Sequence, residues 1–158
     1  MIIVAIDEIS LKKASVILNN LDPKKCMVKI GSVSFNSIGQ EIIFYAAERG
    51  FDIFLDLKLH DIPNTVRKSI EGITSLPISM LTIHISGGRD MMKATMDAVS
   101  GRKIKIFGVT ALTSLSDEDT NKIFKRTASD QVEAMLDLAE SVGIDGVVCS
   151  PHELELVG

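Results

Sequence analysis

Strand-type and helix-type segments alternate along this chain of 158 residues, and the alternation predicts an α/β fold with a parallel sheet. Short apolar, β-branched runs are each followed by a segment whose apolar residues recur at helical spacing. Polar residues also gather where several of the expected strands end. The composition, with 46% hydrophobic and 24% charged residues, is ordinary for a folded domain, and the length is sufficient for a real core.

Six strands are expected, and each is a short apolar run, over residues 2–6, 26–30, 51–57, 80–85, 103–109 and 146–149. A first helix should follow Ser10, a residue type that favours the N-cap position. Proline favours the first turn of a helix, so Pro63 predicts a helix start directly after the third strand. The remaining helices are expected over residues 36–49, over 91–99, and after the polar stretch 114–119, most clearly from Ser129 onward.

Periodicity alone leaves a doubly wound sheet and a closed barrel as alternatives. No glycine-rich phosphate-binding sequence follows the first strand, which disfavours a nucleotide-binding doubly wound fold. Asp7, Lys29, Asp56 and Lys58 instead lie at the ends of the first three strands, as expected for a (β/α)8 TIM barrel with its active site at that end. Such barrels usually need about 200 residues or more. We therefore expect a single barrel domain over residues 1–158 that is incomplete at its C-terminus.

The segment over residues 51–65 carries the strongest functional signal. Asp56 and Lys58 are two positions apart in an apolar strand and should point to the same side. A second carboxylate follows at Asp61, and Thr65 lies near the expected helix start. Charges are costly to bury unless they are paired, so this cluster indicates an active site. A structural ion pair at the barrel mouth is the alternative, and the polar residues ending the two preceding strands count against it.

The pattern Asp-x-Lys-x-x-Asp-Ile-x-x-Thr over residues 56–65 resembles the signature of the orotidine 5'-phosphate decarboxylase family. The resemblance continues in the same order along the chain, over residues 4–7, 28–31, 82–88, 109–114 and 143–150. It implies decarboxylation of orotidine 5'-monophosphate to uridine 5'-monophosphate in pyrimidine biosynthesis. Charge placement carries out this reaction in the family, so the resemblance implies neither a metal nor an organic cofactor.

The same resemblance assigns roles to individual residues. Lys58 is the expected proton donor, Asp56 lies beside the departing carboxylate, and Lys29 holds both in a charged network. Asp61 completes the catalytic set. Asp61 and Thr65 reach into the neighbouring subunit's site, which implies a homodimer with shared active sites. The expected substrate-binding residues are Asp7, Lys29, Asp56, Lys58, Asp61, Ile62, Thr65 and Thr113.

Two rival hypotheses remain. The Mg²⁺-dependent sugar-phosphate branch, which includes 3-keto-L-gulonate 6-phosphate decarboxylase and hexulose-phosphate synthase, also uses Asp-x-Lys-x-x-Asp. The segment from Ile62 to Thr65 favours the nucleotide branch. The other rival is an inactive, truncated remnant. The family holds the substrate phosphate with a Gln, a Gly and an Arg beyond the sixth strand, whereas this sequence ends at Gly158.

Composition argues against several other classes of protein. The net charge is −4 and no basic run is present, which disfavours a nucleic-acid partner. No apolar stretch is long enough to cross a bilayer, and the N-terminus lacks a signal-peptide pattern, so we expect a cytoplasmic location. Cys26 and Cys149 suggest neither a disulfide framework nor a zinc site. His60 and His84 are interpreted as structural residues.

Overall fold

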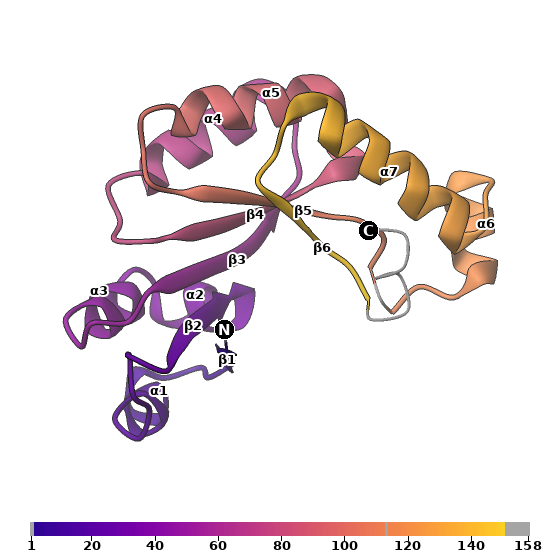
Figure 1. Ribbon diagram of the computed structural model, residues 1–158. Coiled ribbons are helices and arrows are strands. Elements are labelled where there is room, and N and C mark those ends of the chain that lie inside the picture. Colours follow the sequence, from indigo (N-terminus) through magenta and orange to yellow (C-terminus); the bar gives the residue numbers. More distant parts are fainter. Residues whose placement is uncertain (1, 113, 151–158) are drawn as a thin grey trace.

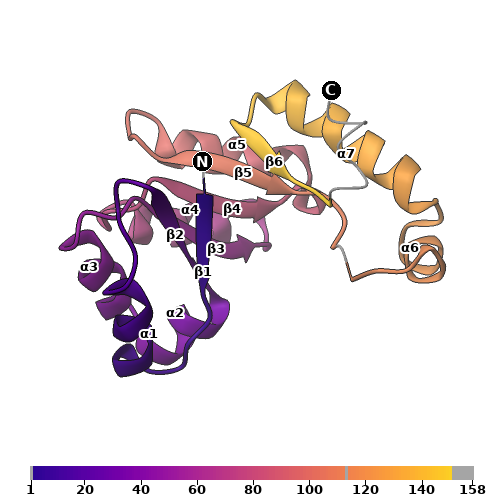
Figure 2. The same cartoon turned by 60° about the horizontal axis from the view of Figure 1, so that its bottom comes forward.

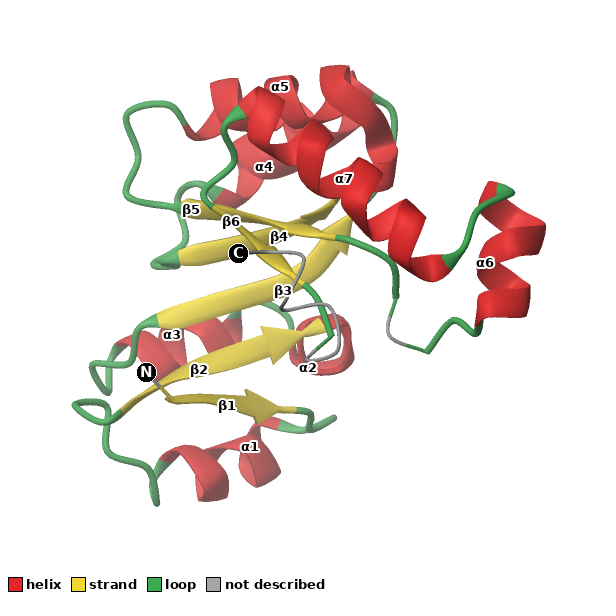
Figure 3. Ribbon diagram, turned by 45° about the vertical axis from the view of Figure 1, so that its right-hand side comes forward, coloured by secondary structure: helices red, strands yellow, loops and turns green. Residues whose placement is uncertain are grey.

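The computed structural model describes residues 2–112 and 114–150 of the chain. Its strands form one parallel sheet in which each strand pairs with the next along the chain. All strands run in one direction across the sheet (Figure 3). The strands are β1 (Ile2–Ile6), β2 (Cys26–Gly31), β3 (Ile53–Leu59), β4 (Met80–His84), β5 (Lys105–Val109) and β6 (Gly146–Val148). The predicted parallel α/β architecture is therefore confirmed.

Helices connect successive strands, and most of them pack along the outer side of the curved sheet, whereas the helix over Asp117–Phe124 lies away from the sheet and packs against the helix that follows it (Figures 1 and 2). A short 3-10 turn, η1 (Ile85–Gly87), precedes α5, which packs against both α4 and α7. The helices are α1 (Leu11–Leu18), α2 (Ser32–Ile38), α3 (Glu41–Ala47), α4 (Pro63–Ile73), α5 (Gly88–Val99), α6 (Asp117–Phe124) and α7 (Ala128–Val142). Consecutive parallel strands with outer helices are the units of a (β/α) barrel. Within the described residues, β6 does not pair back to β1, so these units form a partial barrel.

The core lies between the sheet and the helices. Fully buried aliphatic side chains on the inner strands, such as Ile30 and Leu55, belong to one cluster with apolar helix residues such as Ile43 and Ile70. Side chains on the opposite face of these strands, such as Met27 and Phe54, are also buried. Burial on both faces of the sheet explains why the inner strands are continuous apolar runs. The edge strand β1 differs, because Ile2 is 63% exposed.

The single helix predicted over residues 36–49 is wrong. Two helices occupy this region, α2 from Ser32 and α3 from Glu41, and they are separated at Gly39. Gly39 has a φ of 78°, which ends α2 because a right-handed helix cannot continue through that conformation. The expected apolar spacing is nevertheless real, since Ile42 and Ala46 are buried on α3.

Candidate active site

The end of β3 places Asp56 and Lys58 together, but not through regular strand geometry. Lys58 Nζ lies 2.7 Å from Asp56 Oδ2. Lys58 has a φ of 49°, a left-handed conformation that costs a non-glycine residue roughly 1 kcal/mol. The register of β3 against β4 also shifts between Leu55 and Leu59. The predicted convergence of the two side chains is present, and a bulge in the strand accompanies it.

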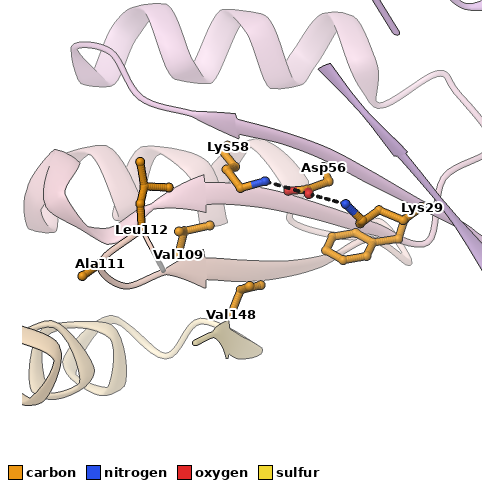
Figure 4. A pocket seen from close by; sticks show the side chains of 8 residues that line it. Lys29, Asp56, Lys58, Val109, Ala111, Leu112 and Val148 are labelled. Atoms are coloured by element: carbon orange, nitrogen blue, oxygen red, sulfur yellow. Dashed lines mark hydrogen bonds and ion pairs between the residues drawn. The ribbon is translucent and has the colours of Figure 1, made fainter. Parts of the chain in front are cut away.

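Asp56 is the centre of a charged cluster drawn from two strands. Its carboxylate is buried, and Oδ2 accepts hydrogen bonds from Lys58 Nζ at 2.7 Å and from Lys29 Nζ at 3.2 Å. Lys29 reaches Asp56 from β2, whose register brings Gly31 opposite Asp56. Figure 4 shows the carboxylate between the two ammonium groups. One carboxylate between two ammoniums leaves one net positive charge, which suits an anionic ligand.

Opposing effects act on the pKa of Asp56. Burial raises the pKa, while hydrogen bonds from Lys58, Thr82 and Lys29 lower it, and the second group of effects prevails. The net pKa lies below the ordinary aspartate value. Asp56 is therefore ionised at neutral pH despite its burial.

Thr82 on β4 is a site residue that was not predicted from the sequence. Its side chain is fully buried, and its hydroxyl donates to Asp56 Oδ1 at 2.8 Å and accepts from the Lys58 backbone N–H at 2.9 Å. A threonine within the apolar run Met80–Ile83 was a detectable signal, because buried hydroxyls need hydrogen-bond partners. The sequence could not show which partner it takes.

A cavity of about 260 Å³ opens beside the charged cluster. That volume lies just below the range for small-molecule sites, roughly 300–1,000 Å³. One wall carries the three charged side chains, and the other walls are apolar, as Figure 4 shows. The lining residues are Lys29, Phe54, Asp56, Lys58, Val109, Ala111, Leu112 and Val148. A flat apolar ring with an anionic substituent matches this division of charge.

Asp7 lies at the end of β1, next to the charged cluster. A Cβ atom on Gly31 would lie 3.6 Å from Asp7 Oδ1, so the carboxylate sits over this glycine. Ser34, which is buried, holds the following backbone, because its Oγ accepts from the Glu8 N–H at 2.9 Å and lies 2.7 Å from Ile6 O. The exposed Asp7 side chain is thus presented from a fixed strand end.

Comparison with known proteins places this geometry in a family. A family model described as "Orotidine 5'-phosphate decarboxylase / HUMPS family" matches residues 1–157. The chain belongs to this family. It is 44% identical to an orotidine 5'-phosphate decarboxylase of Baumannia cicadellinicola, with 98% of this chain and 64% of the relative covered. The corresponding enzyme of Ehrlichia canis is 45% identical, with 99% and 69% covered.

Solved structures give the same relationship for the fold. The orotidine 5'-phosphate decarboxylase of Lactobacillus acidophilus superposes with a TM-score of 0.88 at 36% identity, covering 98% of this chain and 74% of that one. An uncharacterized conserved protein from Geobacillus kaustophilus superposes with a TM-score of 0.90 at 33% identity, covering 99% and 77%. The chain spans about two thirds of the length of the curated family members it matches.

Four of the predicted site residues that the structure describes do not line the cavity, namely Asp7, Asp61, Ile62 and Thr65. Asp61, Ile62 and Thr65 are exposed and do not line the cavity. Asp61 Oδ1 accepts a hydrogen bond from the Ile62 N–H at 2.7 Å, immediately before α4 begins. These residues therefore form an outward-facing corner beside the charged cluster. The predicted substrate-binding residue Thr113 lies outside the described residues.

Neither a metal-binding cluster nor a membrane-spanning helix occurs in the part of the chain that the structure describes. No group of three or more His, Cys, Asp or Glu side chains there could hold a metal ion. No helix there has the length and apolar character needed to cross a membrane.

His60 and His84 lie beside the cluster with their rings tilted by 41° relative to each other and the ring centroids 5.3 Å apart. Burial lowers the pKa of His84, the positive charges of His60 and Lys58 lower it further, and Asp56 opposes them. A histidine with a lowered folded pKa binds a proton more readily in the unfolded chain. The contribution of neutral His84 to the free energy of unfolding should therefore be fully present above the ordinary histidine pKa. It should be lost as the pH falls below that value toward the folded pKa.

This pH dependence is measurable in His84→Gln. Urea unfolding at intervals between pH 7.5 and 5 should show a smaller loss of stability in this variant than in the unchanged chain. His60→Gln is the matched control and should flatten the profile less, because it keeps the half-buried His84. If the free energy of unfolding depended on pH equally in the unchanged chain and in His84→Gln, the lowered pKa of His84 would not be the cause of the pH dependence.

Proposed function

We propose that this chain decarboxylates orotidine 5'-monophosphate to uridine 5'-monophosphate, without a metal or organic cofactor, as part of pyrimidine biosynthesis. The observation that carries the proposal is Asp56, held ionised between the Lys58 and Lys29 ammoniums at one wall of an apolar cavity. The names of the family relatives support the same reaction. A cytoplasmic location follows from the same proposal.

In this mechanism Lys58 delivers the proton. The bond between C6 of the pyrimidine and its carboxylate breaks, carbon dioxide leaves, and the electron pair stays at C6. The Lys58 ammonium stabilises the developing negative charge and then protonates C6, and the resulting amine recovers a proton from water. A lysine beside the reacting carbon can do this because it carries both the charge and a transferable proton.

Asp56 and Lys29 set the electrostatics of that step. Asp56 is ionised and would face the substrate carboxylate, which disfavours the bound reactant relative to a product that has lost this charge. Lys29, bonded to the same Oδ2 atom, offsets part of the charge of Asp56. In the proposed mechanism it would also bond a ribose hydroxyl. Asp7, at the neighbouring strand end, is the second candidate for a ribose contact.

The test is loss of the orotidine 5'-monophosphate absorbance on incubation with the purified chain in EDTA, with the intact mass recorded on the same sample. Metal-independent formation of uridine 5'-monophosphate supports the proposal. Turnover of a sugar phosphate with Mg²⁺, and none of the nucleotide, would assign the chain to the other branch. No turnover of either by a product of 17.2 kDa would favour the remnant hypothesis.

We also propose a homodimer in which Asp61 and Thr65 contribute to the neighbouring subunit's site. The supporting observation is the outward direction of this corner, where Ile62 is 65% exposed next to the exposed Asp61. An exposed aliphatic residue flanked by polar groups is compatible with a subunit contact.

Mixing inactive subunits tests the shared site. Lys58→Ala and Asp61→Ala protomers should each be inactive or nearly so, and together they should regain up to about a quarter of the activity, because random exchange leaves one intact site in half of the dimers. Decarboxylation after subunit exchange is the measurement. The control mixes Lys58→Ala with Lys29→Ala, whose defects lie in one cluster and should not complement. No recovery in demonstrated heterodimers would contradict a contribution from Asp61 across the interface.

A further inference from the structure

We propose that Thr82 is a positioning residue for the decarboxylation, whose hydroxyl fixes both the Lys58 backbone and the Asp56 carboxylate. The inference rests on the proposed function for its kinetic consequence, while its structural consequence can be measured without turnover. Thr82 lines neither the cavity nor its mouth, so it acts through the two residues it bonds.

The first support is the bulge in β3. The β3–β4 ladder pairs Leu55 with Leu81 and Leu59 with Ile83, so four steps along β3 match two along β4. Thr82 is the single β4 residue between these pairs. Its Oγ1 accepts from the Lys58 N–H at 2.9 Å, so a side chain serves an amide inside the irregular part of the ladder. This bond holds Lys58 in its left-handed conformation, which re-aims the side chain.

The second support is the direction of the hydroxyl proton. A backbone N–H can only donate, so Thr82 must act as acceptor toward Lys58. Its own proton is then free for Asp56 Oδ1, 2.8 Å away. Both carboxylate oxygens consequently accept hydrogen bonds, Oδ1 from the hydroxyl and Oδ2 from the two ammoniums. These bonds orient Oδ2 toward the lysines and restrict rotation of the carboxylate.

The third support is burial. Thr82 is fully buried and Asp56 is 7% exposed, so water cannot easily replace the hydroxyl. Without it, Asp56 Oδ1 and the Lys58 amide would each lack a partner inside the protein. The Thr82 hydroxyl therefore links the backbone conformation at the end of β3 to the positions of the Asp56 and Lys58 charges.

The test compares Thr82→Val, which keeps shape but removes the hydroxyl, with Thr82→Ser, which restores it. Asp56 in Thr82→Val should titrate at higher pH, followed by the carbon-13 shift of its carboxyl group. The Lys58 amide should exchange its hydrogen faster. For orotidine 5'-monophosphate, kcat should fall about tenfold or more, the order expected for losing a hydrogen bond to a charged group, with a smaller change in KM. Thr82→Ser should recover all three properties.

Thr95→Val is the matched control. Thr95 is also fully buried, but its hydroxyl bonds Met91 O within α5 and lies outside the site. This variant should leave the Asp56 titration, the Lys58 amide exchange and kcat unchanged. Should Thr82→Val fail to fold, Thr82→Cys supplies a weaker donor of similar size and should give intermediate values.

Unchanged Asp56 titration and unchanged Lys58 exchange in the folded Thr82 variants would overturn the inference, whatever the turnover. Altered titration and exchange in a chain that does not decarboxylate the nucleotide would support the positioning role and count against the proposed function alone. Altered NMR properties with an unchanged kcat in an active chain would overturn the kinetic role.

Discussion

Lys58→Ala should lower kcat for decarboxylation by at least about 10³-fold, because it removes the proposed proton donor together with the positive charge proposed to stabilise the developing carbanion. The ammonium lies 2.7 Å from Asp56 Oδ2 and borders the cavity. The measurement is kcat from the decrease in nucleotide absorbance, with the folded state verified by circular dichroism.

The fold should survive this substitution. The Lys58 side chain is about one third exposed, and its removal creates no core cavity. Alanine and lysine both carry a Cβ, so the cost of the left-handed backbone conformation is similar for both. Lys68→Ala, at an exposed position of α4, is the control and should keep full activity.

Lys58→Arg separates charge from proton delivery. Arginine retains a positive charge but gives up its proton far less readily than lysine. An arginine variant as inactive as alanine is the expected result if Lys58 supplies the proton. Substantial turnover in Lys58→Arg would show that charge alone suffices and would remove Lys58 as the donor.

Asp56→Asn should abolish efficient turnover and also lower the free energy of unfolding by about 2 kcal/mol at neutral pH. The substitution nearly keeps the shape but leaves the Lys29 and Lys58 ammoniums close together without their shared carboxylate. Both lysines are partly exposed, and solvent screening keeps the loss below that of a fully buried pair. Urea denaturation of both proteins gives the difference.

The pH dependence of this difference has a definite sign. The folded pKa of Asp56 is below its unfolded value, so its contribution is present above about pH 4 and is lost as the pH falls through the folded pKa. The stability gap between the unchanged chain and Asp56→Asn should therefore narrow in acid. A gap that stays constant down to the lowest pH at which both fold would contradict the ionised state of Asp56.

Two further variants test the origin of the stability loss in Asp56→Asn. Asp52→Asn is the control, because Asp52 is exposed just before β3 and its side chain accepts a 3.2 Å bond from Ser79 Oγ outside the charged cluster. It should change stability by less than about 0.5 kcal/mol. Adding Lys29→Met to Asp56→Asn should recover part of the lost stability, because one unpaired ammonium is removed.

Much of the fold followed from local pattern. The six strands, the helix start at Pro63 and the parallel sheet were predictable because apolar periodicity and helix-start residues act over a few neighbouring positions. The helix expected over residues 36–49 failed at Gly39, where a glycine adopted a positive φ that its apolar neighbours do not reveal. The apolar periodicity thus located the helices and strands better than it located the break between α2 and α3.

The candidate site divides in the same way. The sequence by itself determined that Asp56 and Lys58 end a buried strand, since both are fixed by two positions of one segment. Only the tertiary structure decided that Lys29 shares Asp56 Oδ2 and that Thr82 holds the other oxygen, because these atoms come from β2 and β4. It also decided that Asp61 and Thr65 face outward rather than into the cavity. Residue type and spacing encode which groups are present, whereas hydrogen-bond partnership depends on strand register and on a bulge that have no local signature.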